Sequence, residues 1–557
     1  MRRLFRPAWI CLLVLAFPLI PIATEIIPVS EVRPGMKGYG LTVLQGSEVV
    51  RFEVEVIDVI KNARPKQDAI LVRCSGQGLE RTRIIAGMSG SPIFLNDKLA
   101  GALAFAWEFS LDPIAGVTPI ESMLQELERP VAPLNPSFSG GAGHGLVPIA
   151  TPLTVSGLDA GPLAALEKEL LPYGWLPVMG GAAEAGAAPD RLVLGGALGA
   201  QMVSGDINMT AVGTVTYLSG STVLAFGHAF YNGGPLSLPL TTARIHTVLS
   251  SQAISFKIAS PGPVVGRLTQ DRQAGIAGRL GELAPTIPYA IHIQGPGRDV
   301  SRDYQVKVIQ HPLLTPIMLQ VVLHQALQSG AALSEPHTIN LKVTADFAGY
   351  APITYEDTLY SLKEPSPGQM LAPVRMLLLN PFAKTELRSM RFELEVLDRM
   401  EVASLESLRA YPLEVEPGET VTVFVRLKPF QAAEEEAVLR IQVPEQAEGS
   451  FTIRVAGGSQ MAPDVAPPQS VDDLIAALHK LYPARSLVAG YSLPGRGVDL
   501  MGQRLRRLPA SVVSVLTPAS ATSARAIPES RTLVQEVPYV VVGSDEIQVK
   551  VRTPLRR

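Results

Sequence analysis

Residues 87–107 read GMSGSPIFLNDKLAGALAFAW, and this stretch decides how the chain is interpreted. Its first part places Ser89 between two glycines. Its second part has two apolar runs separated by the dipeptide Asn96-Asp97. Two apolar runs joined by such a dipeptide are typical of a β-hairpin. We therefore predict a tight glycine turn followed by a hairpin that supports it and offers an edge on which an extended peptide can pair.

The β pattern continues on both sides of this stretch. Phe52, Val54 and Val56 alternate with charged residues, and apolar runs at 211–217 and 222–226 flank a Ser-Gly-Ser turn. The 557 residues include 48 Gly and 47 Pro, a content typical of many short strands joined by turns. These features predict a mainly β fold and exclude an all-helical bundle.

Length and linker composition predict several domains. The Pro-, Gly- and Ser-rich segment 129–145 is a linker candidate, and 312–329 has the spacing of a helix. We expect a signal peptide at 1–23, a peptidase part at 24–255, a β-rich middle domain with one helix at 256–365, an Ig-like β-sandwich at 370–460 and a small α+β region at 466–557.

The N-terminus predicts export. Three arginines precede an apolar run from Ala8 to Ile22, which is the pattern of a secretory signal. The run is short for a membrane span, although its retention as an anchor stays open, and no later segment is long enough to span. We expect a periplasmic or extracellular protein. With Cys11 inside the signal, Cys74 is the only remaining cysteine, so we expect no internal disulfide.

Composition and motifs exclude several kinds of chemistry. Lys and Arg total 48 against 51 Asp and Glu, a balance unsuited to nucleic-acid binding. No spacing of His, Cys and carboxylates suits zinc, and no glycine-rich phosphate loop is present in the sequence. We therefore expect no metal and no cofactor.

The Gly87–Pro92 turn is the strongest candidate for catalysis. A serine nucleophile needs a tight turn that exposes its oxygen and aims nearby N–H groups at a developing oxyanion. We predict Ser89 as the nucleophile and the N–H groups of Gly87 and Ser89 as the oxyanion hole. Ser91 is the weaker alternative because Pro92 follows it, and an ordinary Gly/Ser turn also remains open.

His228 is the best candidate for the base among the eight histidines. It follows an apolar strand in the sequence Ala-Phe-Gly-His-Ala-Phe at 225–230, and such strand ends present side chains to clefts. The other histidines lie in a glycine-rich linker or in strand and helix patterns without glycine turns. A core or surface role for His228 is the alternative.

Residues 33–110 and 200–245 resemble the SpoIVB-type serine peptidase family. The resemblance rests on GMSGSPI at 87–93, the Asn96-Asp97 hairpin, GTVT at 213–216 and LAFGH at 224–228. It implies a fold related to chymotrypsin-like β-barrels, with Ser89 as nucleophile and His228 as base. In the sporulation peptidase the histidine precedes the serine, whereas here it follows, and geometry rather than chain order defines a triad.

The orienting acid is the least defined member of the site. The family's acid position corresponds to about Ser75, where this chain has no aspartate. Asp206 matches another acidic position of the family and is our candidate, with a structural Asx turn as the alternative. Asp68 and Asp58 are weaker alternatives, and a Ser–His dyad also stays open.

Together these features predict an exported serine endopeptidase that hydrolyses protein or peptide substrates through an acyl-enzyme. The downstream β domains are expected to bind partners or envelope components. Two alternatives stay open: an inactive scaffold or binding protein with the peptidase fold, and a peptidase that cleaves only itself.

Overall fold

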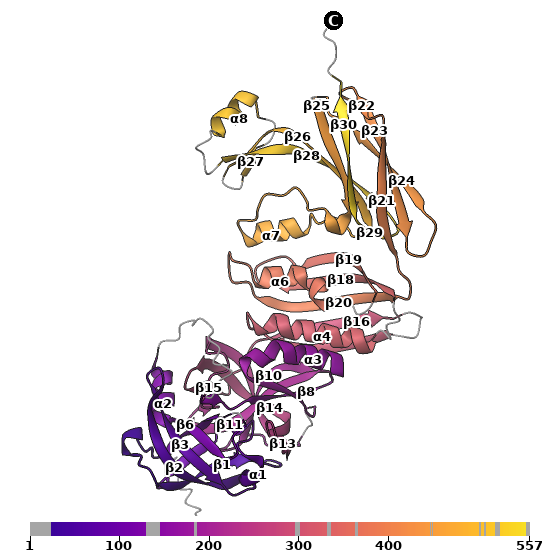
Figure 1. Cartoon of the computed structure of the whole chain (residues 1–557). Helices are drawn as coiled ribbons and strands as arrows, with labels where there is room; N and C mark the ends of the chain where they lie inside the picture. The colour runs from indigo at the N-terminus through magenta and orange to yellow at the C-terminus, as the bar shows by residue number, and fades with distance from the viewer. Residues whose placement is uncertain are drawn as a thin grey trace, which may run out of the picture.

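The structure is a computed structural model. It describes residues 24–552 except 108, 130–144, 183–185, 296–300, 331–335, 363–365, 446, 448, 501–502, 506–507 and 518–523. The expected signal peptide lies outside the described residues. The fold is mainly β, as predicted. Figure 1 shows the N-terminal half at one end of the molecule and the C-terminal sandwich at the other.

The first barrel follows from the strands around the Ser89 turn. Antiparallel pairings join its six strands into a closed ring. Around the ring they are β1 (Lys37–Val43), β2 (Val49–Arg64), β3 (Gln67–Ser75), β6 (Ile114–Pro119), β5 (Lys98–Ala106) and β4 (Pro92–Leu95). Alternating side chains such as Phe52, Val54 and Val56 fill its core, as their spacing predicts.

The hairpin predicted from residues 87–107 is confirmed, but its expected free edge is not. β4 and β5 pair with each other, and the turn residues Asn96 and Asp97 have φ of 51° and 60°, typical of a tight hairpin turn. Because the barrel closes, β4 also pairs with β1, and β5 also pairs with β6 and β7 (Val147–Pro148). An extended peptide therefore finds no open edge along this hairpin.

A second closed ring of six antiparallel strands follows the first. Its strands in ring order are β10 (Ala197–Gly205), β13 (Gly234–Leu249), β14 (Phe256–Arg272), β15 (Gly275–Leu280), β12 (Thr222–Ala225) and β11 (Asn208–Ser219). Two barrels in one chain agree with the β-barrel architecture expected above.

The second barrel continues into a wider sheet of 13 strands. On one side β11 pairs with β8, which pairs with β9. On the other, β10 pairs with β17. The added strands are β8 (Thr151–Ser156), β9 (Trp175–Met179), β17 (Ser301–Ile309), β16 (Thr286–Gln294), β20 (Leu387–Leu397), β18 (His337–Phe347) and β19 (Ile353–Ser361).

This sheet crosses two of the expected domain limits. β13 and β14 pair along their length across the limit placed at residue 255, so residues 256–280 complete the second barrel. β20, expected in the sandwich, pairs with β16 and β18 instead. Sequence alternation identified the strands but carried no signal for which strands pair.

The C-terminal strands form a sandwich whose two sheets share one core. One sheet contains β21 (Val402–Tyr411), β23 (Thr420–Pro429), β24 (Glu435–Gln442) and β29 (Val540–Val542). The other contains β22 (Glu414–Val415), β25 (Gly449–Gly457), β26 (Ser486–Leu500), β27 (Gln503–Leu505), β28 (Ala524–Glu536) and β30 (Ser544–Val551). The sandwich therefore includes strands that the sequence placed in a separate region at 466–557.

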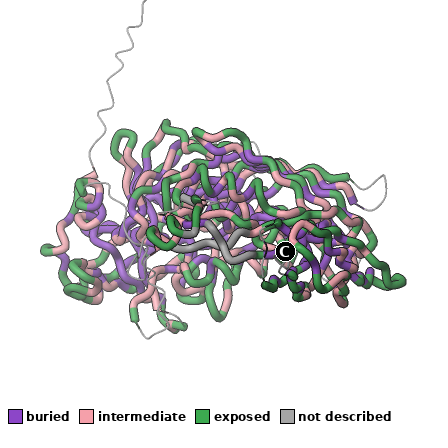
Figure 2. The backbone as a smooth tube through the Cα atoms, turned by 90° about the horizontal axis from the view of Figure 1, so that it is seen from above, coloured by how far each residue is buried: buried purple, intermediate pink, exposed green. Residues whose placement is uncertain are grey.

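Helices cover the sheets at few places. α4 (Leu314–Gly330) matches the helix predicted at 312–329 and packs on β16, β17 and α3 (Ala160–Leu170). The other α-helices are α1 (Leu79–Thr82), α2 (Ile120–Glu128), α5 (Pro367–Met370), α6 (Ala372–Leu378), α7 (Val471–Leu478) and α8 (Ala510–Leu516). None in the described ranges is long and apolar enough for a membrane crossing. Figure 2 shows buried segments running through the interior and exposed ones at the turns.

Candidate active site between the two barrels

Ser89 lies in the turn between α1 and β4 of the first barrel. Two hydrogen bonds fold this turn on itself: Met88 N–H donates to Ile85 O at 3.0 Å and Ser91 N–H to Met88 O at 2.9 Å. Gly90 N–H donates to Leu103 O on β5 at 2.8 Å. The hairpin predicted to support the turn therefore does so.

Threonines of the second barrel hold the same turn from the other side. On β11, Thr214 N–H donates to Ser89 O at 2.9 Å, and its hydroxyl donates to Gly87 O at 3.0 Å. The Thr216 hydroxyl donates to Gly90 O at 2.8 Å. Both threonines belong to the GTVT string, to which the sequence assigned no individual role. The serine turn is thus fixed at the interface between the barrels.

Gly90 is where the Ser89 turn meets the turn that carries His228. A Cβ at Gly90 would lie 2.1 Å from Thr214 O and 2.5 Å from Phe226 N, and φ here is +93°. No residue with a side chain fits such contacts or adopts this φ without strain. The glycine allows the two turns, distant in sequence, to pack backbone against backbone.

The His228 turn is held by the first barrel in return. The Thr118 hydroxyl on β6 donates to Gly227 O at 2.6 Å. Phe226, fully buried, has φ of +66°, which is unusual for an aromatic residue and stores backbone strain. Strained backbone concentrates at functional sites. Each barrel therefore holds the other's candidate catalytic turn.

The reactive atoms of Ser89 and His228 are buried and do not bond to each other. Ser89 Oγ and His228 Nε2 both have no hydrogen-bond partner among the described residues, and the Ser91 hydroxyl shares this state. An unsatisfied buried polar group costs about 1–3 kcal/mol. Native proteins rarely keep several such groups together without a functional reason. Solvent does not reach these atoms in this structure, so another molecule can contact them only after the groups that cover them move.

The His228 ring is held in the form a base requires. His228 Nδ1 lies 2.9 Å from Ala229 O, and because a carbonyl oxygen only accepts, Nδ1 must be the donor. Nε2 then carries the free lone pair. Burial lowers the pKa of His228 to about 4, an effect that the Ala229 carbonyl opposes and the charge of Arg64 reinforces. The imidazole is neutral at neutral pH.

Two backbone N–H groups of the serine turn donate to no described residue, those of Gly87 and Ser89. The intervening Met88 and the following Gly90 and Ser91 all donate to carbonyls. The unbonded amides are the pair predicted to form the oxyanion hole. Unpaired donors at a fixed turn are suited to bind negative charge.

Asp206 does not meet His228. It lies in the turn between β10 and β11, where its carboxylate accepts the Gln305 N–H at 2.6 Å and links the turn to β17. The expected Asp206–His228 pair is therefore absent from this structure, and the Ala229 carbonyl occupies the place of the orienting acid. The structural turn weighed against this assignment fits Asp206 better.

Asp271, which the sequence analysis missed, organises the loop after His228. Its buried carboxylate accepts N–H groups of Phe230 at 2.8 Å and Tyr231 at 3.0 Å. Burial raises the pKa of Asp271 to about 6, against the lowering effect of these hydrogen bonds. Nothing in the sequence around Asp271 distinguishes it from an ordinary strand-end residue.

A small cleft adjoins the serine turn. It has a volume of about 100 Å³, and segments before the serine turn, after β5, around β7 and before β14 line it. Ala86, which precedes Gly87, is in its wall, and the exposed side chain of Phe109 is at its rim. The Arg83 guanidinium donates to Ser110 O at 3.0 Å and Gln252 O at 3.1 Å. This cleft therefore reaches the residue next to the serine turn.

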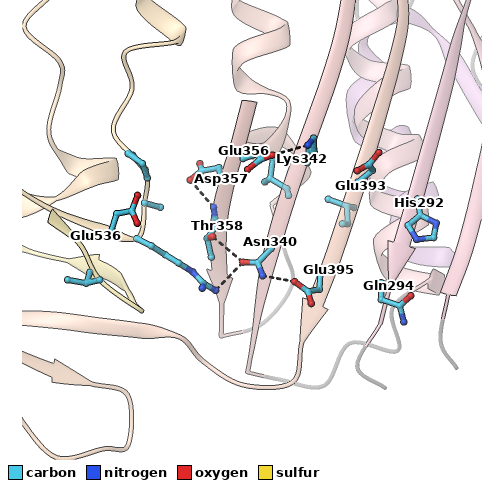
Figure 3. A pocket seen from close by; sticks show the side chains of 16 residues that line it. His292, Gln294, Asn340, Lys342, Glu356, Asp357, Thr358, Glu393, Glu395 and Glu536 are labelled. Atoms are coloured by element: carbon cyan, nitrogen blue, oxygen red, sulfur yellow. Dashed lines mark hydrogen bonds and ion pairs between the residues drawn. The ribbon is translucent and has the colours of Figure 1, made fainter. Parts of the chain in front are cut away.

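A larger hollow lies far along the chain from the serine turn. Residues of β16, β18, β19 and β20 line it together with Arg485 and Glu536, and its volume is about 670 Å³. Figure 3 shows the labelled side chains of these strands and Glu536 around the hollow. Its polar side chains bond to one another: Asn340 donates to Glu395 at 2.8 Å, and Arg485 donates to Asn340 at 3.0 Å. Across the described ranges, no group of His, Cys and carboxylates is arranged to hold a metal ion.

A second Ser–His pair in the second barrel joins the exposed His246 to the buried Ser260. His246 Nε2 lies 2.7 Å from Ser260 Oγ. Ser260 is within β14, whose backbone pairs with β13, so it lacks the turn geometry that presents amides to an oxyanion. This pair serves as an internal comparison for the Ser89 site.

Comparison with protein families matches residues 19–124 to the model described as SpoIVB peptidase S55. The match covers about a fifth of the chain, contains Ser89 and ends before His228. Comparisons with curated proteins and with solved structures found no match. The resemblance based on GMSGSP is confirmed: the part of the chain that contains the Ser89 turn is similar to the SpoIVB peptidase S55 family of serine peptidases.

Proposed function

We propose that the protein is an exported serine endopeptidase whose site lies between the two barrels. Ser89 Oγ attacks the carbonyl carbon of a peptide bond while His228 Nε2 takes the serine proton. The amides of Gly87 and Ser89 stabilise the oxyanion that forms. His228 then gives its proton to the leaving amine, and water hydrolyses the acyl-enzyme in a second, similar step.

One observation carries this proposal. A hydroxyl, an imidazole nitrogen with a free lone pair and two N–H donors are all unbonded on two turns that pack against each other. These are the four groups that acyl transfer requires. The SpoIVB peptidase match over the serine turn supports the same chemistry.

The missing carboxylate sets an expectation for the rate. The Ala229 carbonyl orients the ring but carries no full negative charge, so it stabilises an imidazolium less than a carboxylate does. Peptidase activity should therefore be modest compared with a complete triad. The same observation favours the alternative function, an inactive scaffold that binds envelope proteins.

Labelling with a fluorophosphonate tests the proposal. The full-length protein is treated with a tagged probe, and the modified peptide is identified by mass spectrometry. We expect adduct on Ser89, loss of labelling in Ser89→Ala and His228→Gln, and retention in the control Ser260→Ala. No adduct in folded protein, or adduct that persists in Ser89→Ala, would contradict the proposed site.

Self-cleavage and export are tested separately. The intact mass of wild type compared with Ser89→Ala reveals any processing that depends on this serine. N-terminal sequencing of the protein from the producing cells tests whether residues 1–23 are removed. We propose that the domains beyond the barrels bind protein or envelope partners, a role that pull-down with the Ser89→Ala protein addresses without substrate turnover.

A further inference from the structure

Lys257 is a fully buried lysine in contact with the serine turn. It lies near the start of β14, where its N–H donates to Ala86 O at 3.1 Å. Its side chain crosses Gly87: a Cβ at Gly87 would lie 3.0 Å from Lys257 Cδ and 3.3 Å from Cγ. A side chain at residue 87 would crowd this lysine, which runs beside Gly87, the residue that carries one of the two unbonded amides.

The ammonium of Lys257 has a single hydrogen-bond partner among the described residues. Nζ donates to the hydroxyl of Thr42 on β1 at 2.9 Å, so the side chain spans both barrels. Among the described residues no carboxylate lies within ion-pair distance of it. Burial alone lowers the pKa of Lys257 to about 7, and no other titratable group contributes to this shift.

A purely structural role explains Lys257 poorly. Its side chain passes Gly87 and ends at the Thr42 hydroxyl, and an apolar side chain would fill this space without the cost of burying charge. A buried amine without an ion pair destabilises the folded state, and such groups at the edge of a candidate site are typically kept because they contribute to function.

We propose that Lys257 is a third functional group of this site and that its ammonium stabilises the oxyanion formed at the Gly87 and Ser89 amides. This inference rests on the proposed peptidase function. In the step concerned, the serine proton passes to His228, the substrate carbonyl oxygen becomes an oxyanion, and Lys257 keeps its proton. A positive charge in a site closed to water acts strongly on such an intermediate.

The pH dependence follows from this assignment. His228 must be neutral, which requires a pH above about 4, and Lys257 must be charged, which requires a pH below about 7. Activity is then highest between these values and falls on the alkaline side as the lysine loses its proton.

The test measures the second-order rate of fluorophosphonate labelling from pH 4 to pH 9. Wild type should lose rate as pH rises through about 7. Lys257→Arg keeps the charge at every pH tested and should lose this alkaline decline. Lys257→Met should react roughly 100-fold more slowly at pH 6, with no alkaline decline. Lys342→Met, an exposed control, should match wild type.

Three outcomes would overturn the inference. Wild-type labelling that rises through pH 7 and vanishes in Lys257→Arg would make the lysine a proton acceptor instead. A wild-type rate and profile in Lys257→Met would make it a space-filling residue. Both leave the peptidase proposal standing if Ser89 is labelled, whereas absence of labelling in wild type refutes the proposed function and this inference with it. Circular dichroism of each variant confirms that it folds.

Discussion

Replacing Lys257 by methionine should make the protein more stable while it weakens the site. Folding lowers the pKa of this lysine from 10.5 to about 7, and one pKa unit corresponds to about 1.4 kcal/mol. Below pH 7 the buried ammonium therefore costs the folded state up to about 5 kcal/mol. Methionine has similar length and no charge, and it forfeits only the hydrogen bond to Thr42, about 1 kcal/mol.

The sign of the pH dependence is fixed by which state holds the proton. Between pH 7 and 10.5 the unfolded wild-type chain keeps a proton that the folded chain has lost, so wild-type stability rises with pH in this window. The methionine variant has no such contribution from residue 257. Its advantage over wild type should be largest below pH 7 and shrink by about 1.4 kcal/mol per pH unit above it.

Urea unfolding followed by tryptophan fluorescence measures this difference. Of the three tryptophans, Trp9 lies in the expected signal peptide, Trp107 follows β5 of the first barrel, and Trp175 begins β9 in the sheet that continues the second barrel. The fluorescence therefore reports on the barrels and their sheet rather than on the sandwich. Measurements at pH 6, 7, 8 and 9 give the slope. A difference between the variants that does not change with pH, or a less stable Lys257→Met at pH 6, would refute the account of the buried ammonium.

Three further predictions concern the packing around the site. Gly90→Ala would place a Cβ 2.1 Å from Thr214 O, so it should destabilise the barrels by roughly 4 kcal/mol and abolish fluorophosphonate labelling. The same unfolding and labelling assays measure both effects. The control Gly35→Ala has open space around the new Cβ and should cost much less stability. Asp271→Asn should place an NH₂ group against backbone N–H donors, which should lower the free energy of unfolding by about 3 kcal/mol and slow labelling of Ser89. An unchanged labelling rate would show that the 230–233 loop does not position His228. Burial raises the pKa of the Cys74 thiol to about 12, so Cys74 should resist alkylation in the folded protein and react after denaturation. Alkylation of the peptide that contains Cys74 under native conditions would contradict its burial.

The sequence was most informative where local pattern decides structure. The alternation at Phe52–Val56 and the Asn96-Asp97 turn predicted a strand and a hairpin that the first barrel contains. The two glycines around Ser89 predicted a tight turn, and the structure has this turn, with φ of +95° at Gly87 and +93° at Gly90. Such features depend on a few neighbouring residues and are therefore readable from the sequence.

Features that depend on tertiary contacts were not predictable. Closure of the first barrel removed the edge expected at the β4–β5 hairpin, and pairing of β14 with β13 moved a domain limit. Asp206 was chosen by its place in a family pattern, yet its carboxylate bonds to Gln305. The position of Lys257 beside Gly87 could not be predicted from the sequence, because it arises from the way the two barrels pack together.

A crystal structure of the protein after reaction with a fluorophosphonate tests the central claim most directly. The account predicts phosphorus bonded to Ser89 Oγ, a phosphonyl oxygen that accepts the Gly87 and Ser89 N–H groups, and His228 Nε2 within hydrogen-bond reach of the adduct. An adduct on Ser91, or one on Ser89 with the His228 ring still buried and turned away from it, would contradict a Ser89–His228 site.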